Sequence, residues 1–222
     1  MNDDLKQRLY IIADRMRNMA TIGKHFADNV YEQERLDTML ALAVEVAALA
    51  DEEYTPDEIR AHFWAEPWHR LSPAIGVDAF VLNSHHEILL IQRADNQHWA
   101  MPGGLSEVGY TTAETAVKEL WEEAGLRGEA KRLLGIFDNR IWGTRSKLHL
   151  MNMVYLVECE ELHPSIGVEC LDCGFFAADA LPAPLHPGHD TRIPACFRAL
   201  DGNTYFDPAA ADTIDLSNHQ QQ

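Results

Sequence analysis

The chain has 222 residues and a formal net charge of −17 at pH 7, from 18 Lys and Arg against 35 Asp and Glu. Because nucleic-acid backbones are bound by clustered Lys and Arg, this charge argues against a nucleic-acid partner. Hydrophobic residues make up 46% of the chain, which suffices for a packed core and argues against wholesale disorder. We therefore expect one ordinary domain with a small addition.

Neither an export signal nor a membrane span is apparent. The first four residues are acidic at positions 3 and 4, and no apolar segment of the export type follows them. The longest apolar stretch, residues 39–50, is broken by Glu45 and is shorter than the roughly 18–20 residues that a span needs. We expect a cytoplasmic protein without a membrane partner.

The four cysteines are interpreted as free thiols, because a chain without an export signal stays in a reducing compartment. One group has the residue types of a zinc site, but its spacing is irregular and no second Cys-x-x-Cys accompanies it. The members of that group are Cys159, His163, Cys170 and Cys173. The fourth cysteine, Cys196, stands apart from it.

The first 66 residues are predicted to be helical. Apolar residues recur there at steps of three or four and predict one buried stripe: Leu5, Leu9, Ile12, Met16 and Met19. A second helix is predicted over residues 31–51, and its apolar side is formed by Leu36, Met39, Leu40, Ala43, Val44 and Ala47. Two helices cannot form a core alone, so they must pack on the rest of the chain or on a second copy. Thr55 has the position of an N-cap before Pro56.

After residue 73 the pattern changes to short strands. Two of them, residues 77–82 and 87–92, are separated by a polar turn and predict a hairpin. Further strands are expected at residues 132–138, 149–158 and 173–176, and helices at residues 112–124 and 190–199. Gly125 is expected to end the first of those helices. The organisation predicted is a helical region at 1–66, an α/β domain at 67–207 and a polar tail at 208–222.

The helix at 112–124 carries the most informative pattern. At 100° per residue, Glu119, Glu122 and Glu123 fall on one face, and a mostly apolar face lies beside it. Three clustered carboxylates would suit a hard cation such as Mg²⁺ or Mn²⁺, although a solvated acidic face is the alternative. The preceding Pro102-Gly103-Gly104 turn favours the cation, because glycines let the backbone approach a metal or a phosphate.

Together these segments resemble the Nudix box of the Nudix hydrolases, G-x5-E-x7-R-E-U-x-E-E-x-G-U, where U is aliphatic. The matching residues are Gly104, Glu119, Leu120, Glu122, Glu123, Gly125 and Leu126. The run at residues 98–104 is similar to the W-x-x-P-G-G lead into that box. Two positions differ, since Tyr110 replaces the first Glu and Lys118 replaces the Arg. In the family these two side chains support the metal-binding loop and helix. Glu114 is spaced to pair with Lys118.

The resemblance extends beyond the box. Residues 20–36 resemble the helical extension of the subgroup that includes ADP-ribose and CDP-choline pyrophosphatases, an extension that helps to form a homodimer. Residues 137–140, 174–182 and 190–192 are also similar to that subgroup. The resemblance implies a Nudix-type α/β/α sandwich with a mixed sheet, preceded by a small N-terminal helical domain, and a homodimer formed through the N-terminal helices.

The activity implied is hydrolysis of a nucleoside diphosphate linked to a moiety X, giving a nucleoside monophosphate and phosphoryl-X. The metal ligands implied for Mg²⁺ or Mn²⁺ are the Gly103 carbonyl and the glutamates Glu119, Glu122 and Glu123. Such an ion would lower the pKa of a bound water. Glu119 and Glu169 are candidate general bases, with an ordinary surface position as the alternative for Glu169.

Four residues are candidates for substrate binding: Arg93, Trp99, Asp138 and Arg140. The guanidinium of Arg140 has the planar fork that suits a phosphate. A plain surface charge is the alternative for Arg93, and a packing role is the alternative for Trp99.

Two other functions stay open. The first is a weak or inactive Nudix-like protein that binds a nucleotide metabolite for regulation, as Tyr110 and Lys118 would favour. The second is an interaction module built on the N-terminal helices. ADP-ribose, CDP-choline and nucleotide sugars are equally compatible substrates, because fold does not fix substrate.

Overall fold

The computed structural model describes residues 3–50, 55–64, 73–139, 141–142 and 150–208. The chain divides into two compact units, which are considered separately. One contains Met1–Pro73 and Leu105–Thr115, and the other contains Ala74–Gly104 and Ala116–Gln222. Within the described ranges, no helix is both long enough and apolar enough to cross a membrane.

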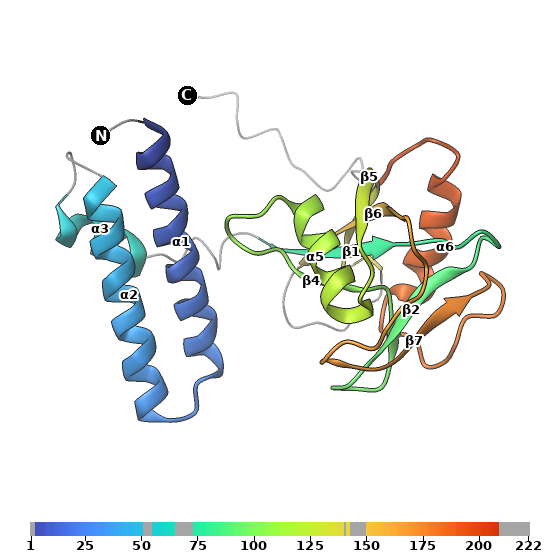
Figure 1. Ribbon diagram of the computed structural model, residues 1–222, viewed down its shortest axis with the longest axis horizontal. Helices are drawn as coiled ribbons and strands as arrows, with labels where there is room; N and C mark the ends of the chain where they lie inside the picture. Colours follow the sequence, from blue (N-terminus) through green and yellow to red (C-terminus); the bar gives the residue numbers. More distant parts are fainter. Residues whose placement is uncertain (1–2, 51–54, 65–72, 140, 143–149, 209–222) are drawn as a thin grey trace, which may run out of the picture. The chain divides into compact units, whose positions relative to one another are not determined.

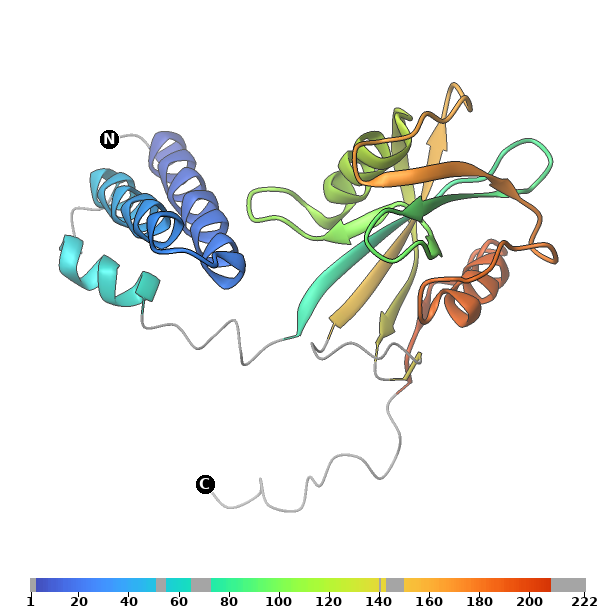
Figure 2. The same ribbon diagram turned by 90° about the horizontal axis from the view of Figure 1, so that it is seen from below.

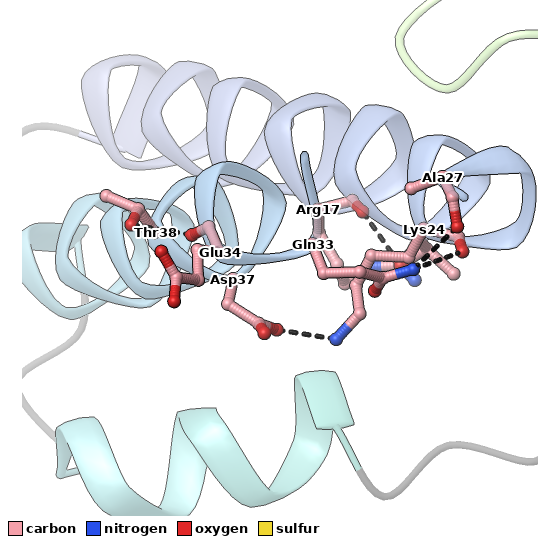
Figure 3. Close-up of polar contacts among 8 residues, drawn as sticks. Arg17, Lys24, Ala27, Gln33, Glu34, Asp37 and Thr38 are labelled. Carbon is pink, nitrogen blue, oxygen red and sulfur yellow. Dashed lines mark hydrogen bonds and ion pairs between the residues drawn. The ribbon is translucent and has the colours of Figure 1, made fainter. Parts of the chain in front are cut away.

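The first unit is built on a hairpin of two helices, α1 (Asp3–Phe26) and α2 (Val30–Ala50), followed by α3 (Pro56–Trp64). Polar contacts join the two long helices near their connection (Figure 3). The Gln33 amide donates to the carbonyls of Lys24 and Ala27 at 3.3 and 2.9 Å, and Lys24 Nζ lies 2.5 Å from Asp37 Oδ1. Gln33 thus provides hydrogen bonds for carbonyls at the end of α1 that lack helical partners.

The predicted burial is correct for most of α2 and wrong for much of α1. Leu40, Ala43, Val44 and Ala47 are buried as expected, while Leu36 and Met39 are half-buried. In α1 the buried residues are alanines, Ala13 and Ala20, while the predicted stripe residues Leu5, Ile12 and Met19 are 46%, 47% and 61% exposed. The alanines allow α1 to approach α2 closely, so the larger side chains of the neighbouring face remain outside this contact.

Two further contacts order the first unit. Thr55 caps α3 as predicted, because its backbone N–H donates to Glu58 Oε2 at 2.8 Å and its hydroxyl accepts from the Glu58 N–H at 3.4 Å. Within the same unit, Arg15 Nη2 lies 3.3 Å from the Tyr110 hydroxyl, and its guanidinium carbon lies 4.9 Å from the ring centre. Tyr110 therefore takes part in a cation–π contact.

The second unit contains two sheets between two helices. The strands are β1 (Ala74–Phe80), β2 (Ile88–Arg93), β3 (Trp99–Ala100), β4 (Gly103–Leu105), β5 (Gly128–Asp138), β6 (Leu150–Cys159), β7 (Cys170–Phe176) and β8 (Tyr205–Phe206), and the helices are α5 (Thr112–Ala124) and α6 (His189–Ala199). One sheet has the order β4-β1-β6-β5-β8 and the other the order β3-β2-β7. The larger sheet is mixed, since β1 and β6 are parallel and β5 and β6 antiparallel.

Helices α5 and α6 lie on opposite sides of the strands (Figures 1 and 2). Alternate residues of the strands supply the two cores, as the period of two in a strand requires. Phe80 of β1 and Leu90 of β2 pack with Ile193 of α6 in one core. Ala79 and Leu89 pack in the other core, which includes Leu120 and Ala124 of α5. The expected α/β/α sandwich with a mixed sheet is confirmed.

The predicted hairpin of β1 and β2 is wrong beyond its tip. The tight turn exists, with Asn83 N–H donating to the Glu87 carbonyl at 3.1 Å and a bridge between Leu82 and Ile88. The strands then separate into different sheets. Each is an inner strand of its own sheet, β1 between β4 and β6 and β2 between β3 and β7, so neither has an edge left for the other.

The other predicted elements lie close to the observed ones. The bounds of α5 agree at both ends, and Gly125 follows it with φ of 66°. Strands β5 and β7 begin earlier than predicted, at Gly128 and Cys170. The two-residue strands β3 and β8 were not predicted, because so short a segment has no period of its own.

Candidate active site

The beginning of α5 is fixed by a capping box. The backbone N–H of Thr111 donates to Glu114 Oε2 at 2.7 Å, and the Glu114 N–H donates to the Thr111 hydroxyl at 3.1 Å. One turn further on, Lys118 Nζ lies 2.6 Å from Glu122 Oε2. The lysine that stands at the arginine position of the box is thus paired with one of the predicted metal ligands.

The glycine turn and the glutamate face of α5 come together as predicted. Gly103 N–H donates to Glu123 Oε2 at 2.8 Å. A Cβ on Gly104 would lie 2.6 Å from Glu119 Oε1, and a Cβ on Gly103 would lie 2.2 Å from the Val77 carbonyl. Gly103 therefore needs glycine, because a side chain there would collide with the backbone of β1, whereas a side chain at Gly104 would require the end of the flexible Glu119 side chain to shift.

Glu123 has a strongly perturbed carboxyl pKa. It is buried, and burial raises its pKa to about 7. The carboxylates of Glu119 and Asp78 raise that pKa further, while the Gly103 N–H and the Arg93 guanidinium act in the opposite direction. A raised carboxyl pKa next to a second carboxylate is the electrostatic environment that a bound cation would relieve.

The donor atoms suit a hard divalent cation. In the described part of the chain, no three His, Cys, Asp or Glu side chains are already gathered as a metal-binding group, and Glu122 is held by Lys118. Mg²⁺ needs no such group, since it commonly takes one or two protein carboxylates together with phosphate oxygens and water. Glu119 and Glu123, which flank the Gly103–Gly104 turn, fit that requirement.

The loop before β7 brings Glu169 near the end of α5. Ser165 N–H donates to the Ala124 carbonyl at 2.8 Å, and Gly167 N–H donates to the Glu123 carbonyl at 3.1 Å. The loop thereby caps carbonyls at the C-terminal end of the helix. Glu169 itself is exposed, and its backbone carbonyl accepts from Ala94 at 2.9 Å.

Two of the predicted substrate residues precede the glycine turn in the sequence. Arg93 forms a two-point contact with Asp95, with Nε and Nη2 at 3.0 and 2.9 Å from its carboxylate oxygens. This contact raises the Arg93 pKa. The Trp99 ring packs edge-on against Phe176 with centroids 4.9 Å apart. Both side chains therefore have structural contacts of their own.

The other two predicted substrate residues lie at the end of β5. Asp138 is buried, and its backbone N–H donates to Asp207 Oδ2 at 2.6 Å. Asp207 also accepts from the Trp142 indole at 2.7 Å. Arg140 lies outside the described residues. Asp207 and Trp142 were missed by the sequence analysis, because their contact spans 65 residues.

A cavity of about 720 Å³ lies beside Trp142 and the first turn of α6. Its lining is Ile141, Trp142, Leu181, Pro182, Ala183, Leu185, Pro187, Gly188, Asp190 and Thr191. The wall is mostly apolar, with one carboxylate and one hydroxyl. Such a lining is typical of pockets for small organic ligands.

A buried polar cluster was also missed. Asp78 of β1 lies 3.5 Å from Arg192 Nη2 and 3.9 Å from His189 Nε2, and all three residues are buried. Burial raises the Asp78 pKa and lowers the His189 pKa well below its usual value. The available signal was an aspartate inside the otherwise apolar run of β1.

Comparison with known proteins now decides the family. A model of the Nudix domain matches residues 72–196, more than half of the chain. The chain belongs to the Nudix family. It is a Nudix hydrolase, as the resemblance of its box implied.

Three similar proteins support this assignment. "Putative ADP-ribose pyrophosphatase YjhB" of Bacillus subtilis (strain 168) is 29% identical over 201 residues, which cover 88% of this chain and 95% of that protein. The crystal structure of a UDP-X diphosphatase matches 91% of this chain and 99% of its own, with a TM-score of 0.60 at 24% identity. An ADP-ribose pyrophosphatase structure from Streptococcus suis 89-1591 has a TM-score of 0.53 at 30% identity, covering 61% of this chain and all of that one.

Proposed function

We propose that this Nudix hydrolase cleaves a nucleoside diphosphate linked to a moiety X, in the class of ADP-ribose, CDP-choline and nucleotide sugars, with Mg²⁺ or Mn²⁺. The observation that carries the proposal is the junction of the glycine turn with α5, where Glu123 accepts from Gly103 N–H and Glu119 lies against Gly104. The relatives named as ADP-ribose pyrophosphatases support the substrate class.

Glu119, Glu123 and the Gly103 carbonyl would hold the divalent ion, and Glu122 would join them on release from Lys118. When bound, the ion offsets charge on the diphosphate and lowers the pKa of water. Water adds to one phosphorus, the bridging P–O bond breaks, and the products are a nucleoside monophosphate and phosphoryl-X. Since phosphoryl transfer depends mainly on positioning and charge, no reactive nucleophile is needed from the protein.

Two carboxylates are proposed to accept the proton of the attacking water. Glu119 lies in the site itself, beside Gly104. Glu169 is exposed on the loop that caps the end of α5, where a carboxylate is accessible to a substrate. Activity profiles of Glu119→Gln and Glu169→Gln against pH separate the two when they are measured at saturating metal, because loss of the base then removes the acidic limb of the profile.

Recognition of the substrate is assigned to residues on the α6 side. The cavity beside Trp142 has room for a nucleoside, and Asp190 and Thr191 offer it polar partners. Asp138, Arg93, Trp99 and Arg140 remain proposed substrate residues. For Arg93 this role requires the guanidinium to leave Asp95 or to use its remaining donor atoms.

A hydrolysis screen tests the proposal. Wild type is assayed with Mg²⁺ and with Mn²⁺ over ADP-ribose, CDP-choline and several nucleotide sugars, beside Glu122→Gln. We expect turnover that chelator abolishes and the variant reduces by about a hundredfold or more. Metal-dependent binding without turnover of any substrate would contradict the enzyme function and favour a regulatory, metabolite-binding protein, for which the Lys118–Glu122 pair is the supporting observation.

We also propose that the helical region ends and the Nudix domain begins at about residue 66. The N-terminal helices are proposed to form a homodimer. Four apolar side chains spaced seven residues apart are exposed along α1, with exposed fractions of 46%, 47%, 61% and 76% for Leu5, Ile12, Met19 and Phe26. A spacing of seven places them on one face, as at a helix–helix contact. The four free cysteines suit a reducing compartment, and we propose the cytoplasm.

Light scattering on the full chain tests the dimer. We expect twice the chain mass for wild type and the single mass for Ile12→Glu combined with Met19→Glu. Leu49→Glu is the control, because Leu49 is 70% exposed on α2 but lies outside the stripe. A monomeric wild type would contradict the proposal, and the interaction-module reading would lose its support with it.

A further inference from the structure

The metal-binding turn is backed by a buried carboxylate on its other side. Gly103 donates its N–H to Glu123 at 2.8 Å. The position that its Cβ would take lies 2.8 Å from Asp78 Oδ1 and 3.0 Å from the Asp78 α-carbon. The residue before the turn is tied to the same strand, since Ala79 N–H donates to the Pro102 carbonyl at 2.8 Å. Gly103 is therefore enclosed between Glu123 and Asp78.

Asp78 is in turn held by the first turns of α6. Its Oδ2 lies 3.5 Å from Arg192 Nη2, and its Oδ1 lies 3.9 Å from His189 Nε2. Arg192 Nη2 is itself 3.1 Å from His189 Nδ1. Among the described residues, Asp78 Oδ2 has no hydrogen-bond partner, so Arg192 is the close positive charge that compensates this carboxylate. A buried charge is stable only when it is compensated in this way.

This arrangement gives α6 a connection to a site that lies mostly on α5. The Asp78 side chain is 10% exposed and the Arg192 side chain 3% exposed, so solvent does not weaken their interaction. Loss of the Arg192 charge would change the environment of Asp78, and Asp78 occupies the space that a Cβ on Gly103 would need. The chain of contacts runs from Arg192 through Asp78 to the backbone of the predicted metal-binding turn.

We propose that Asp78 and Arg192 are positioning residues of the metal site, which set the place of the Gly103 carbonyl relative to Glu123 without binding the metal themselves. The inference rests on the proposed function, because it requires a cation at this turn. Residues that orient metal ligands from behind commonly change metal affinity or activity by about 10- to 100-fold when they are replaced.

Direct Mn²⁺ binding by the full chain, measured by electron paramagnetic resonance, tests the role apart from turnover. Asp78→Asn keeps the size of the side chain and removes its charge. We expect it to raise the Mn²⁺ dissociation constant by about tenfold or more. Arg192→Gln should have the same effect, and Arg192→Lys, which keeps the charge, a smaller one. If Asp78→Asn does not fold, the two Arg192 variants carry the test.

The matched control is Arg132→Gln. Arg132 anchors the other end of α6 by donating to the carbonyls of Ala199 and Leu200 at 2.8 and 3.3 Å, far along the helix from Asp78. We expect this variant to lower the melting temperature while the Mn²⁺ dissociation constant stays within about twofold of wild type. If it weakens Mn²⁺ as much as Asp78→Asn does, the effect is one of general stability and the proposal is overturned.

Two other outcomes would overturn the inference and separate it from the proposed function. Wild-type Mn²⁺ affinity in Asp78→Asn and in Arg192→Gln would remove the positioning role and leave the hydrolase proposal intact. Absence of Mn²⁺ binding by wild type would overturn the positioning role, and the hydrolysis screen would then decide the proposed function by itself. Weakened binding by those variants in a protein that hydrolyses none of the substrates tested would still support the positioning role.

Discussion

Two groups of charged side chains, one on each of the helices that cover the sheets, differ in exposure. Helix α5 holds Glu119 and Glu122 at an accessible edge, beside the glycine turn. Helix α6 buries His189 and Arg192 against Asp78. The spacing of the glutamates on α5 can be read from the local sequence. The contact of His189 and Arg192 with Asp78 exists only after β1 and α6 have packed. The difference teaches that a sequence motif identifies the proposed ligands, while the residues packed behind them come from distant parts of the chain.

The largest effect is expected from replacing Gly103, which should disrupt the proposed metal site beside α5. In Gly103→Ala the new Cβ would lie 2.2 Å from the Val77 carbonyl, so the backbone must move. Because a displacement of about 1 Å near reacting groups costs roughly a hundredfold, we expect activity to fall by at least that factor. Gly174→Ala is the control, since its Cβ would come no closer than 3.6 Å to other atoms. Initial rates of hydrolysis are measured for both variants. Near-normal activity in Gly103→Ala would contradict the proposed placement of the Gly103 backbone in the metal site.

Replacing Arg192 should destabilise the buried cluster that α6 forms with Asp78. Arg192→Leu leaves Asp78 as an uncompensated buried carboxylate, which typically costs about 3–5 kcal/mol of unfolding free energy. Adding Asp78→Asn removes that charge, so the double variant should regain part of the loss. Urea denaturation of the three proteins measures the coupling. A double variant that is as unstable as the sum of its parts would show that the pair does not interact.

The pH dependence of stability should distinguish the two sides further. The folded-state pKa of Glu123, about 7, is raised above its ordinary 4.5. Its protonated form therefore favours folding below pH 4.5, and that contribution is lost as the pH rises through 7. The loss is roughly 3 kcal/mol at most. We expect chelator-treated wild type to melt lower at pH 8 than at pH 5, and Glu123→Gln to show a weaker dependence. The same slope in both proteins would contradict this assignment.

The smallest effect is expected at the start of α5. Thr111→Ala removes the hydroxyl that accepts from the Glu114 N–H, and loss of such a cap typically costs about 1 kcal/mol. Activity measured well below the melting temperature should stay within about twofold of wild type, because Thr111 touches no proposed ligand. Thermal melting together with an assay checks both statements. A large loss of activity at unchanged stability would mean that the cap also shapes the glutamate face.

The sequence predicted best what a local pattern determines. The bounds of α5 and its Gly125 stop follow from spacing along the chain, and the approach of the Gly103–Gly104 turn to the glutamates was implied by the resemblance to the Nudix box. The separation of β1 and β2 could not be read in this way, because partner choice depends on β6 and β7, more than 50 residues away. The Asp78–Arg192 pair escaped for the same reason. The burial of Ala13 and Ala20 in α1 was missed, because a regular stripe of larger apolar residues lies beside them.

The most direct test of the central claim is Mg²⁺-dependent hydrolysis of ADP-ribose by wild type, Glu123→Gln and Glu129→Gln, each with and without chelator. Glu129 is an exposed glutamate of β5 paired with Lys131, so its variant makes the same chemical change away from the site. The account predicts chelator-sensitive turnover by wild type and Glu129→Gln, and a loss of about a hundredfold or more in Glu123→Gln. Equal turnover by Glu123→Gln and wild type would contradict it, because the buried carboxylate at Gly103 would then have no part in the reaction.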